Sequence, residues 1–361
     1  MQMRNHNQPM KKFIHSERVV LESGLVLPRV EVAYHTYGHL NPNGDNVIWV
    51  FHALTANSNV PDWWPGLFGE KRTLDPSRYF IVCANILGSC YGTTGPSTIN
   101  PETNERYGLD FPNYTIRDMV TLHRLLAEHL GIHKIALGIG GSLGGQQLLE
   151  WACIEPHRFE HIVAIATNAC HSPWGIAFNT SQRMALEADS DFHTNKPNAG
   201  QDGLRAARAM ALLSYRHYDT YAMTQKDDYC KRNGFSADSY QRYQGEKLVQ
   251  RFDAHSYYRL SQAMDSHHLG RHRKSVESAL QRIRAKTAII AIDSDLLFPV
   301  KEQLLLANMI PDAKFHIVQS DHGHDGFLIE TNRINQIVIE FFNCHQINNT
   351  PNNHSVKKEI L

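Results

Sequence analysis

Cysteines, net charge and long apolar runs are all scarce in this sequence of 361 residues. The six cysteines are scattered and form no C-x-x-C pair, which is typical of reduced thiols in a cytoplasmic protein. Lysine plus arginine and aspartate plus glutamate both number 36, so no positive excess favours nucleic acid or an anionic membrane as a partner. The longest apolar stretches, such as residues 46–54, are too short to span a bilayer, and the polar residues 1–12 do not resemble a secretory signal. We therefore expect a cytoplasmic protein that binds neither nucleic acid nor membrane.

Motifs for bound metals and nucleotides are also missing. There is no H-E-x-x-H, and the close histidine pairs at 267–268 and at 322 and 324 offer too few ligands for a metal site. The glycine-rich run at 138–143 has Leu143 where a dinucleotide fingerprint needs its third glycine, and no phosphate-binding G-x-x-x-x-G-K-[ST] occurs. We predict no metal and no permanently bound cofactor.

Short apolar segments alternate with amphipathic helical patterns in the first half of the chain. Such alternation predicts an α/β fold with a mostly parallel central sheet flanked by helices. From about residue 170 the chain becomes polar, rich in aromatic residues and helical by pattern, until strand-like segments resume at 287–292 and 314–318. We therefore predict a core of residues 13–169 and 285–344, an inserted helical lid at 170–284, and polar tails at 1–12 and 345–361.

The sharpest local signal is the G-x-S-x-G motif at residues 140–144, which reads GGSLG. It lies between a strand pattern and a helix pattern, which is the context that a nucleophilic serine at a tight turn requires. Glycines leave room for the crowded backbone, and the following helix N-terminus favours developing negative charge. Ser142 is thus the predicted nucleophile, although a glycine turn without catalytic function remains the alternative.

A nucleophilic serine needs a histidine base and an acid that orients it. In proteins with this motif the chain order is serine, then aspartate or glutamate, then histidine. Asp295 and His324 satisfy that order, and each follows a predicted strand, where catalytic loops gather in open α/β sheets. Asp293 and His322 are the nearby competitors. We predict Ser142, Asp295 and His324 as a catalytic triad.

The transition state of acyl transfer also needs donors for its oxyanion. One donor is expected to be the backbone N–H of Leu143, directly after the nucleophile. The second should come from the loop after the strand near residues 45–51, and we predict the N–H of Leu54. Donors of this kind lower a barrier by ~3–4 kcal/mol.

Segments spread over residues 18–343 match one known family in the same order. They are 52–55, 85–90, 94–97, 140–145, 203–208, 243–248, 265–267, 294–299 and 323–328. On these segments the chain resembles the homoserine O-acetyltransferase family, the acyl-CoA-dependent branch of the α/β-hydrolase fold. The chain departs from the family pattern at Ala56, where glycine is frequent, and at Asp321 and His322, where proline or an aromatic residue is frequent. None of these positions has an assigned role.

The resemblance implies a ping-pong acyltransferase of methionine biosynthesis, with acetyl-CoA as co-substrate, L-homoserine as acceptor and an acyl-Ser142 intermediate. It assigns Arg208 to the acceptor carboxylate and Asp325 to its ammonium, and it matches Tyr215 to a pocket tyrosine. These roles are chemically sound, because a guanidinium pairs bidentately with a carboxylate and a carboxylate pairs with an ammonium. The resemblance also implies a homodimer.

Three other activities stay open from the sequence. The donor could be succinyl-CoA, the acceptor could be L-serine, or the protein could be an esterase of the same fold. A transferase must exclude water from its acyl-enzyme, and we expect the insertion to form a lid that narrows the entrance. An esterase for neutral esters has no use for the opposite charges of Arg208 and Asp325.

Overall fold

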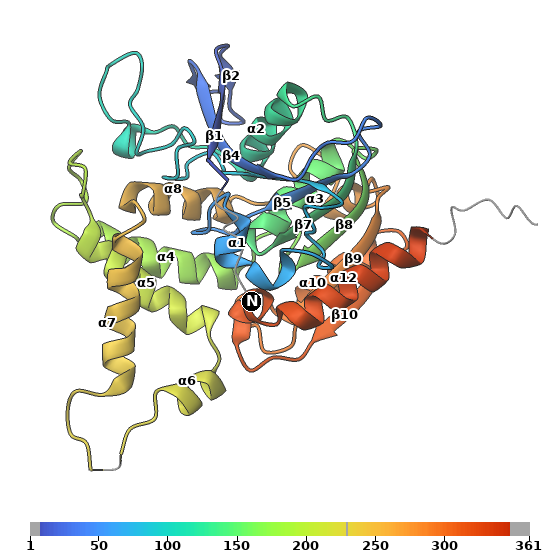
Figure 1. The fold of residues 1–361 in the computed structure, drawn as a ribbon. Coiled ribbons are helices and arrows are strands. Elements are labelled where there is room, and N and C mark those ends of the chain that lie inside the picture. The colour runs from blue at the N-terminus through green and yellow to red at the C-terminus, as the bar shows by residue number, and fades with distance from the viewer. Residues whose placement is uncertain (1–7, 229, 347–361) are drawn as a thin grey trace, which may run out of the picture.

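The computed structural model describes residues 8–228 and 230–346, and its centre is a mixed sheet (Figure 1). Eight strands form this sheet. In spatial order they are β1 (Lys11–His15), β4 (Val30–Tyr37), β6 (Phe80–Ala84), β5 (Val47–Phe51), β7 (Ile135–Gly141), β8 (Phe159–Ile165), β9 (Lys286–Ile292) and β10 (Lys314–Val318). All pairs from β6 to β10 are parallel, whereas β1 and β4 add an antiparallel edge. The predicted fold class, a mostly parallel sheet flanked by helices, is confirmed.

The sheet is covered on both faces, which explains why its strands read as continuous apolar runs. In β5, Val47, Trp49 and Phe51 belong to one apolar cluster, and the alternate residues Ile48 and Val50 belong to the other. Helices α2 (Ile116–His129), α3 (Leu143–Ile154) and α10 (Val300–Met309) contribute to the first cluster. Helices α1 (Val60–Trp63) and α12 (Thr331–Gln346) contribute to the second. Because a strand alternates its side chains between faces, both layers hold the same strands in place.

Shorter elements complete the core. A hairpin of β2 (Val19–Val20) and β3 (Val26–Leu27) lies outside the main sheet. Turns of 3-10 helix occur at η1 (Pro65–Leu67), η2 (Gly108–Asp110) and η3 (Gly323–Asp325). Helix α11 (Gly326–Ile329) and helix α12 are separated at Glu330, whose ψ of 37° departs from helical geometry.

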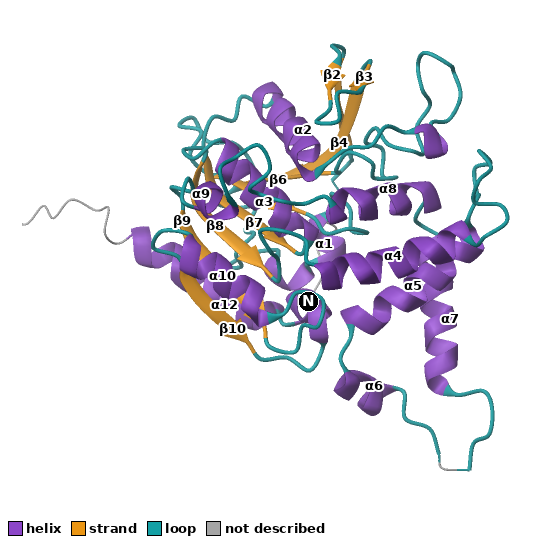
Figure 2. Ribbon diagram, turned by 180° about the vertical axis from the view of Figure 1, so that it is seen from behind, coloured by secondary structure: helices purple, strands orange, loops and turns teal. Residues whose placement is uncertain are grey.

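Helices alone make up the regular structure between β8 and β9. They are α4 (Pro173–Glu187), α5 (Gln201–Tyr215), α6 (Tyr218–Thr224), α7 (Ser236–Val249), α8 (Ala254–Asp265) and α9 (Val276–Leu280). Helix α4 packs against α5 and α8, and α7 packs against α5. Figure 2 shows α4, α5 and α7 grouped beside the sheet, whereas α9 contacts α3 and α10 of the core. The last part of this stretch therefore lies against the core and not with the other inserted helices.

Both predicted polar tails extend about two residues too far into the chain. Strand β1 starts at Lys11 and pairs with β4, so the sheet takes in two residues that were assigned to the N-terminal tail. Helix α12 continues through Gln346, past the predicted boundary at residue 344. The physical reason is that backbone pairing and helix continuation do not require apolar side chains. Positions 1–7 and 347–361 lie outside the described residues.

Candidate active site

Ser142 lies at the turn between β7 and α3, in a conformation that side chains seldom adopt. Its φ is 57° and its ψ is −128°, outside the usual regions for a residue with a Cβ. Such a conformation costs on the order of 1–3 kcal/mol and persists only when the surroundings enforce it. They do so here through glycines: a Cβ at Gly140 would lie 2.6 Å from the carbonyl of Gly144, and one at Gly144 would lie 2.1 Å from the carbonyl oxygen of Phe51.

The structure brings Ser142, His324 and Asp295 together at the carboxyl ends of β7, β10 and β9. The Oγ of Ser142 lies 2.9 Å from Nε2 of His324, and Nδ1 of His324 lies 2.7 Å from Oδ2 of Asp295. An ionised carboxylate only accepts hydrogen bonds, so Nδ1 carries the ring proton and donates it to Asp295. Nε2 is then the acceptor for the hydroxyl of Ser142. This is the arrangement that a serine nucleophile and its general base require.

The competing residues have other partners. Oδ1 of Asp293 accepts the N–H of Ser320 at 2.9 Å, which ties together the loops that follow β9 and β10. Nδ1 of His322 lies 3.4 Å from Oγ1 of Thr220. Oδ1 of Asp295, in contrast, accepts the N–H groups of Leu297 and Phe298 at 2.8 Å each, which holds its carboxylate toward His324.

The three residues are withdrawn from solvent. Ser142 is 5%, Asp295 4% and His324 3% exposed. The imidazole of His324 stacks on Phe298 at a centroid distance of 5.1 Å, and Phe327 and Tyr215 lie at 5.2 and 5.8 Å. Low solvent access strengthens electrostatic interactions within the site and limits attack by water.

The two residues predicted to provide oxyanion donors flank the nucleophile turn. Leu143 is the first residue of α3, where backbone N–H groups have no acceptor within the helix. Leu54 follows β5 in a loop held by two residues that the sequence analysis did not identify. Nδ1 of His52 lies 2.9 Å from the carbonyl oxygen of Ala53, and Arg251 donates to the carbonyl oxygen of Thr55 at 2.6 Å. Burial lowers the pKa of His52 to about 4, so its ring is neutral near pH 7.

The inserted helices bring charged and aromatic residues toward His324. Arg208 and Tyr215 lie seven residues apart on one face of α5, with the guanidinium of Arg208 5.5 Å from the Tyr215 ring. Asp325 directly follows His324. Its Oδ2 forms an ion pair of 2.9 Å with Nε of Arg216, which the sequence analysis did not single out. No motif marks Arg216, since its role depends on how the end of α5 meets η3.

The pKa of Asp325 lies above its usual value. Burial raises it, and the positive charges of Arg216 and Arg208 offset only part of that effect. The side chain retains 14% exposure, so a ligand can still reach it. Arg208 and Asp325 thus place opposite charges near His324, Arg208 beside the Tyr215 ring that lies against the imidazole and Asp325 directly after it in the chain.

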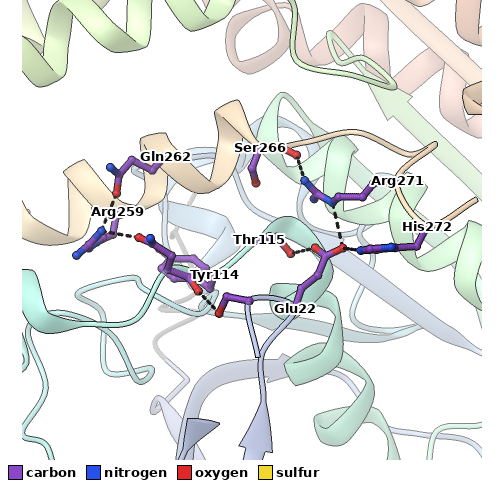
Figure 3. Close-up of a pocket in the computed structure, with 10 residues that line it drawn as sticks. Glu22, Tyr114, Thr115, Arg259, Gln262, Ser266, Arg271 and His272 are labelled. Carbon is purple, nitrogen blue, oxygen red and sulfur yellow. Dashed lines mark hydrogen bonds and ion pairs between the residues drawn. The ribbon is translucent and has the colours of Figure 1, made fainter. Parts of the chain in front are cut away.

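A separate pocket of about 400 Å³ lies where the β2–β3 hairpin meets α8 (Figure 3). None of its lining residues belongs to the triad. Arg271 donates through Nε to Glu22 at 3.0 Å, and Arg259 donates to Gln262 at 2.9 Å, so these polar groups bind one another. Within residues 8–228 and 230–346 no group of three or more His, Cys, Asp or Glu is placed to hold a metal ion, and no helix has the length and apolar character to cross a membrane.

The fold and the serine turn define the class of protein first. A family model described as the alpha/beta hydrolase fold matches residues 46–331. A crystal structure of esterase E22 superimposes with a TM-score of 0.85 at 23% sequence identity, covering 92% of this chain and all of that one. At this identity the likeness shows the shared fold alone.

The particular family follows from closer relatives. The homoserine O-acetyltransferase of Cyclobacterium marinum is 47% identical over 91% of this chain and 94% of its own length. That of Chloroherpeton thalassium is 46% identical over 90% of this chain and 86% of its own length. The crystal structure of the Bacillus anthracis homoserine O-acetyltransferase superimposes with a TM-score of 0.86 at 25% identity, covering 93% of this chain and 97% of that one. The chain belongs to the homoserine O-acetyltransferase family.

Proposed function

We propose that this protein transfers an acetyl group from acetyl-CoA to the hydroxyl of L-homoserine, as a step of methionine biosynthesis. The observation that carries the proposal is the placement of His324 between Ser142 and Asp295, with the opposite charges of Arg208 and Asp325 beside it. Acetyl-CoA acts as co-substrate and no cofactor is permanently bound. Family membership supports this choice over other reactions of the same fold.

In the first half-reaction the enzyme takes up the acetyl group. Nε2 of His324 accepts the proton of the Ser142 hydroxyl while Oγ attacks the thioester carbonyl. The N–H groups of Leu143 and Leu54 stabilise the oxyanion. When the carbon–sulfur bond breaks, His324 returns its proton to the departing thiolate, which leaves as CoA. Asp295 holds the imidazole in the required tautomer and stabilises its charged form.

In the second half-reaction the acceptor hydroxyl replaces the thiol. Arg208 binds the carboxylate of L-homoserine, Asp325 binds its ammonium, and Tyr215 lines the same side of His324. His324 removes the proton of the acceptor hydroxyl as it attacks the acetyl-serine, then returns a proton to Ser142. Holding both ends of the acceptor raises its effective concentration relative to water, which favours transfer over hydrolysis.

The first experiment is thiol release from acetyl-CoA and succinyl-CoA, each with L-homoserine, L-serine or no acceptor. We expect fast release only with acetyl-CoA and L-homoserine. A preference for succinyl-CoA or L-serine would reassign the donor or the acceptor. Release that ignores the acceptor would indicate an esterase and would refute the roles given to Arg208 and Asp325.

We further propose that the protein forms a homodimer and acts in the cytoplasm. Its inserted helices expose large apolar side chains that a second copy would cover, namely Met184, Met210, Leu213, Tyr218, Met223, Phe235 and Tyr243. Light scattering behind size-exclusion chromatography tests this: Leu213→Glu should convert the dimer to a monomer. A wild-type protein that elutes as a monomer would refute it.

A further inference from the structure

Arg216 joins the inserted helices to the loop that carries the catalytic histidine. It is the C-terminal capping residue of α5, and its Nε lies 2.9 Å from Oδ2 of Asp325. The two side chains are only 21% and 14% exposed, so solvent screens the pair weakly. Of the cations near Asp325, Arg216 acts most strongly on its carboxylate and Arg208 acts next.

Backbone contacts fix this junction as well. Gly323 has a φ of 62°, and a Cβ there would lie 2.8 Å from the carbonyl carbon of Arg216. The hydroxyl of Thr220, at the start of α6, donates to the carbonyl oxygen of Asp321. The chain at 216–220 therefore packs directly on the loop at 321–325. Arg216 is held against Asp325 by the fold and not by a flexible surface contact.

We propose that Arg216 is a positioning residue for acceptor recognition, whose charge holds the Asp325 carboxylate in place for the ammonium of the amino acid. This rests on the proposed function. Arg208 also acts on Asp325, yet among the described residues no ion pair within 4 Å joins the two. A direct pair between them would occupy both of the side chains that are proposed to bind the acceptor. By pairing with Asp325 itself, Arg216 favours the ionised carboxylate and leaves Arg208 free for the acceptor carboxylate.

The two half-reactions separate this role from a merely structural one. The first uses no ammonium, so Arg216→Gln should leave the burst of CoA release without acceptor unchanged in rate and amplitude. In the second, kcat/KM for L-homoserine should fall roughly 100-fold, as when one partner of a buried ion pair is removed. For 4-hydroxybutyrate, which lacks the amino group, kcat/KM should change by less than about threefold, since removing a contact to an absent group costs nothing.

Two further variants sharpen the test. Arg216→Lys keeps the charge and should restore part of the preference for L-homoserine over 4-hydroxybutyrate. Arg242→Gln removes an exposed arginine of α7 that pairs with Asp238, and it should behave as wild type in both half-reactions. In Arg216→Gln the acid limb of kcat/KM for L-homoserine should move to higher pH, because loss of the cation raises the pKa of Asp325 further.

The proposal is overturned if Arg216→Gln lowers kcat/KM equally for both acceptors, or if the burst slows with it, because either result means that Arg216 only supports the histidine loop. An unchanged preference for L-homoserine also overturns it. If Arg216→Gln does not fold, the same ratio measured with Arg216→Lys decides. Failure of the wild type to use L-homoserine at all would refute the proposed function instead, and the wild-type assay reports this before any variant is made.

Discussion

The sheet core and the inserted helices contribute to the site in different ways. In the core, Ser142, Asp295 and His324 each follow a parallel strand, and the carboxyl ends of those strands meet at one edge of the sheet. In the insertion, Arg208 and Arg216 reach the site only through the packing of α5 against η3. The core thus positions the triad by topology, whereas the insertion brings Arg208 and Arg216 toward it by tertiary contact. Changes in the core should therefore slow both half-reactions, whereas changes in the insertion should slow only the second.

Ser142→Ala should have the largest effect and should stop both half-reactions. Without the hydroxyl no acetyl-enzyme forms, and turnover should fall by about 10⁴-fold or more. The checks are CoA release and the mass of the intact protein after mixing with acetyl-CoA, which should show no added acetyl group. Retention of a homoserine-dependent burst in this variant would contradict the assignment of the nucleophile.

Asp295→Asn should be nearly as severe. The N–H groups of Leu297 and Phe298 would hold the amide oxygen, so the amide NH2 would face Nδ1 and favour the wrong tautomer of His324. We expect kcat to fall by about 10⁴-fold with both half-reactions slowed together. Single-turnover kinetics of acetylation and deacetylation measure this. The matched control is Asp293→Asn, because the carboxylate of Asp293 accepts the N–H of Ser320 and does not contact the imidazole. A comparable loss of kcat in the control would contradict the assignment of Asp295 as the residue that orients His324.

Arg208→Met should distinguish the insertion from the core most clearly, because it should impair only the second half-reaction. Loss of the guanidinium should reduce kcat/KM for L-homoserine by about 100-fold, while acetylation of Ser142 by acetyl-CoA stays near the wild-type rate. Hydrolysis should account for a larger share of the acetyl-enzyme. The measurement is product partitioning between O-acetylhomoserine and acetate; wild-type partitioning would remove Arg208 from the acceptor site.

Glu150→Gln should change stability and not specificity. Glu150 on α3 has a side chain only 3% exposed and pairs with Arg117 at 2.7 Å and Arg273 at 2.8 Å, so it links the core to the chain after α8. Leaving two arginines without this carboxylate should lower the free energy of unfolding by about 3 kcal/mol, measured by urea denaturation at pH 7. The preference for L-homoserine should not change.

The pKa of Glu150 predicts how the stability difference between wild type and Glu150→Gln changes with pH. Burial alone would raise the pKa of Glu150, but its bonds to Arg273 and Arg117 outweigh burial and hold the pKa below its ordinary value of 4.5. A folded pKa that is lowered contributes stability above pH 4.5, and that contribution disappears as the pH falls through the folded value. The difference between wild type and Glu150→Gln should therefore be constant near neutrality and shrink below pH 4.5. A difference that grows on acidification would contradict the pairing.

Much of the core could be predicted because its signals are local. The apolar run around β5 and the glycines around Ser142 each depend on neighbouring residues alone. Gly131, with a φ of 67°, follows the C-terminal cap of α2, a position that favours glycine for local backbone reasons. No residue pattern indicated the start of β1 at Lys11, since backbone pairing at a sheet edge tolerates polar residues. No pattern indicated the break between α11 and α12 either.

The residues of the site also differ in whether the sequence indicated them. Chain order and motif spacing indicated Ser142, Asp295 and His324, and the resemblance to a family indicated Arg208 and Asp325. They did not indicate Arg216, Arg251 or His52, whose partners lie 109, 196 and 34 positions away along the chain in Asp325, Thr55 and Ile86.

Residue pattern alone was enough to specify a parallel α/β sheet and the order of its catalytic groups, because strand periodicity and turn geometry are properties of neighbouring residues. Only tertiary packing decided which arginine pairs with Asp325, because α5 and α6 pack on the loop at 321–325. The same holds for the contact of Arg251 with the carbonyl oxygen of Thr55. Such contacts depend on the relative placement of distant segments, and no short-range pattern encodes that placement.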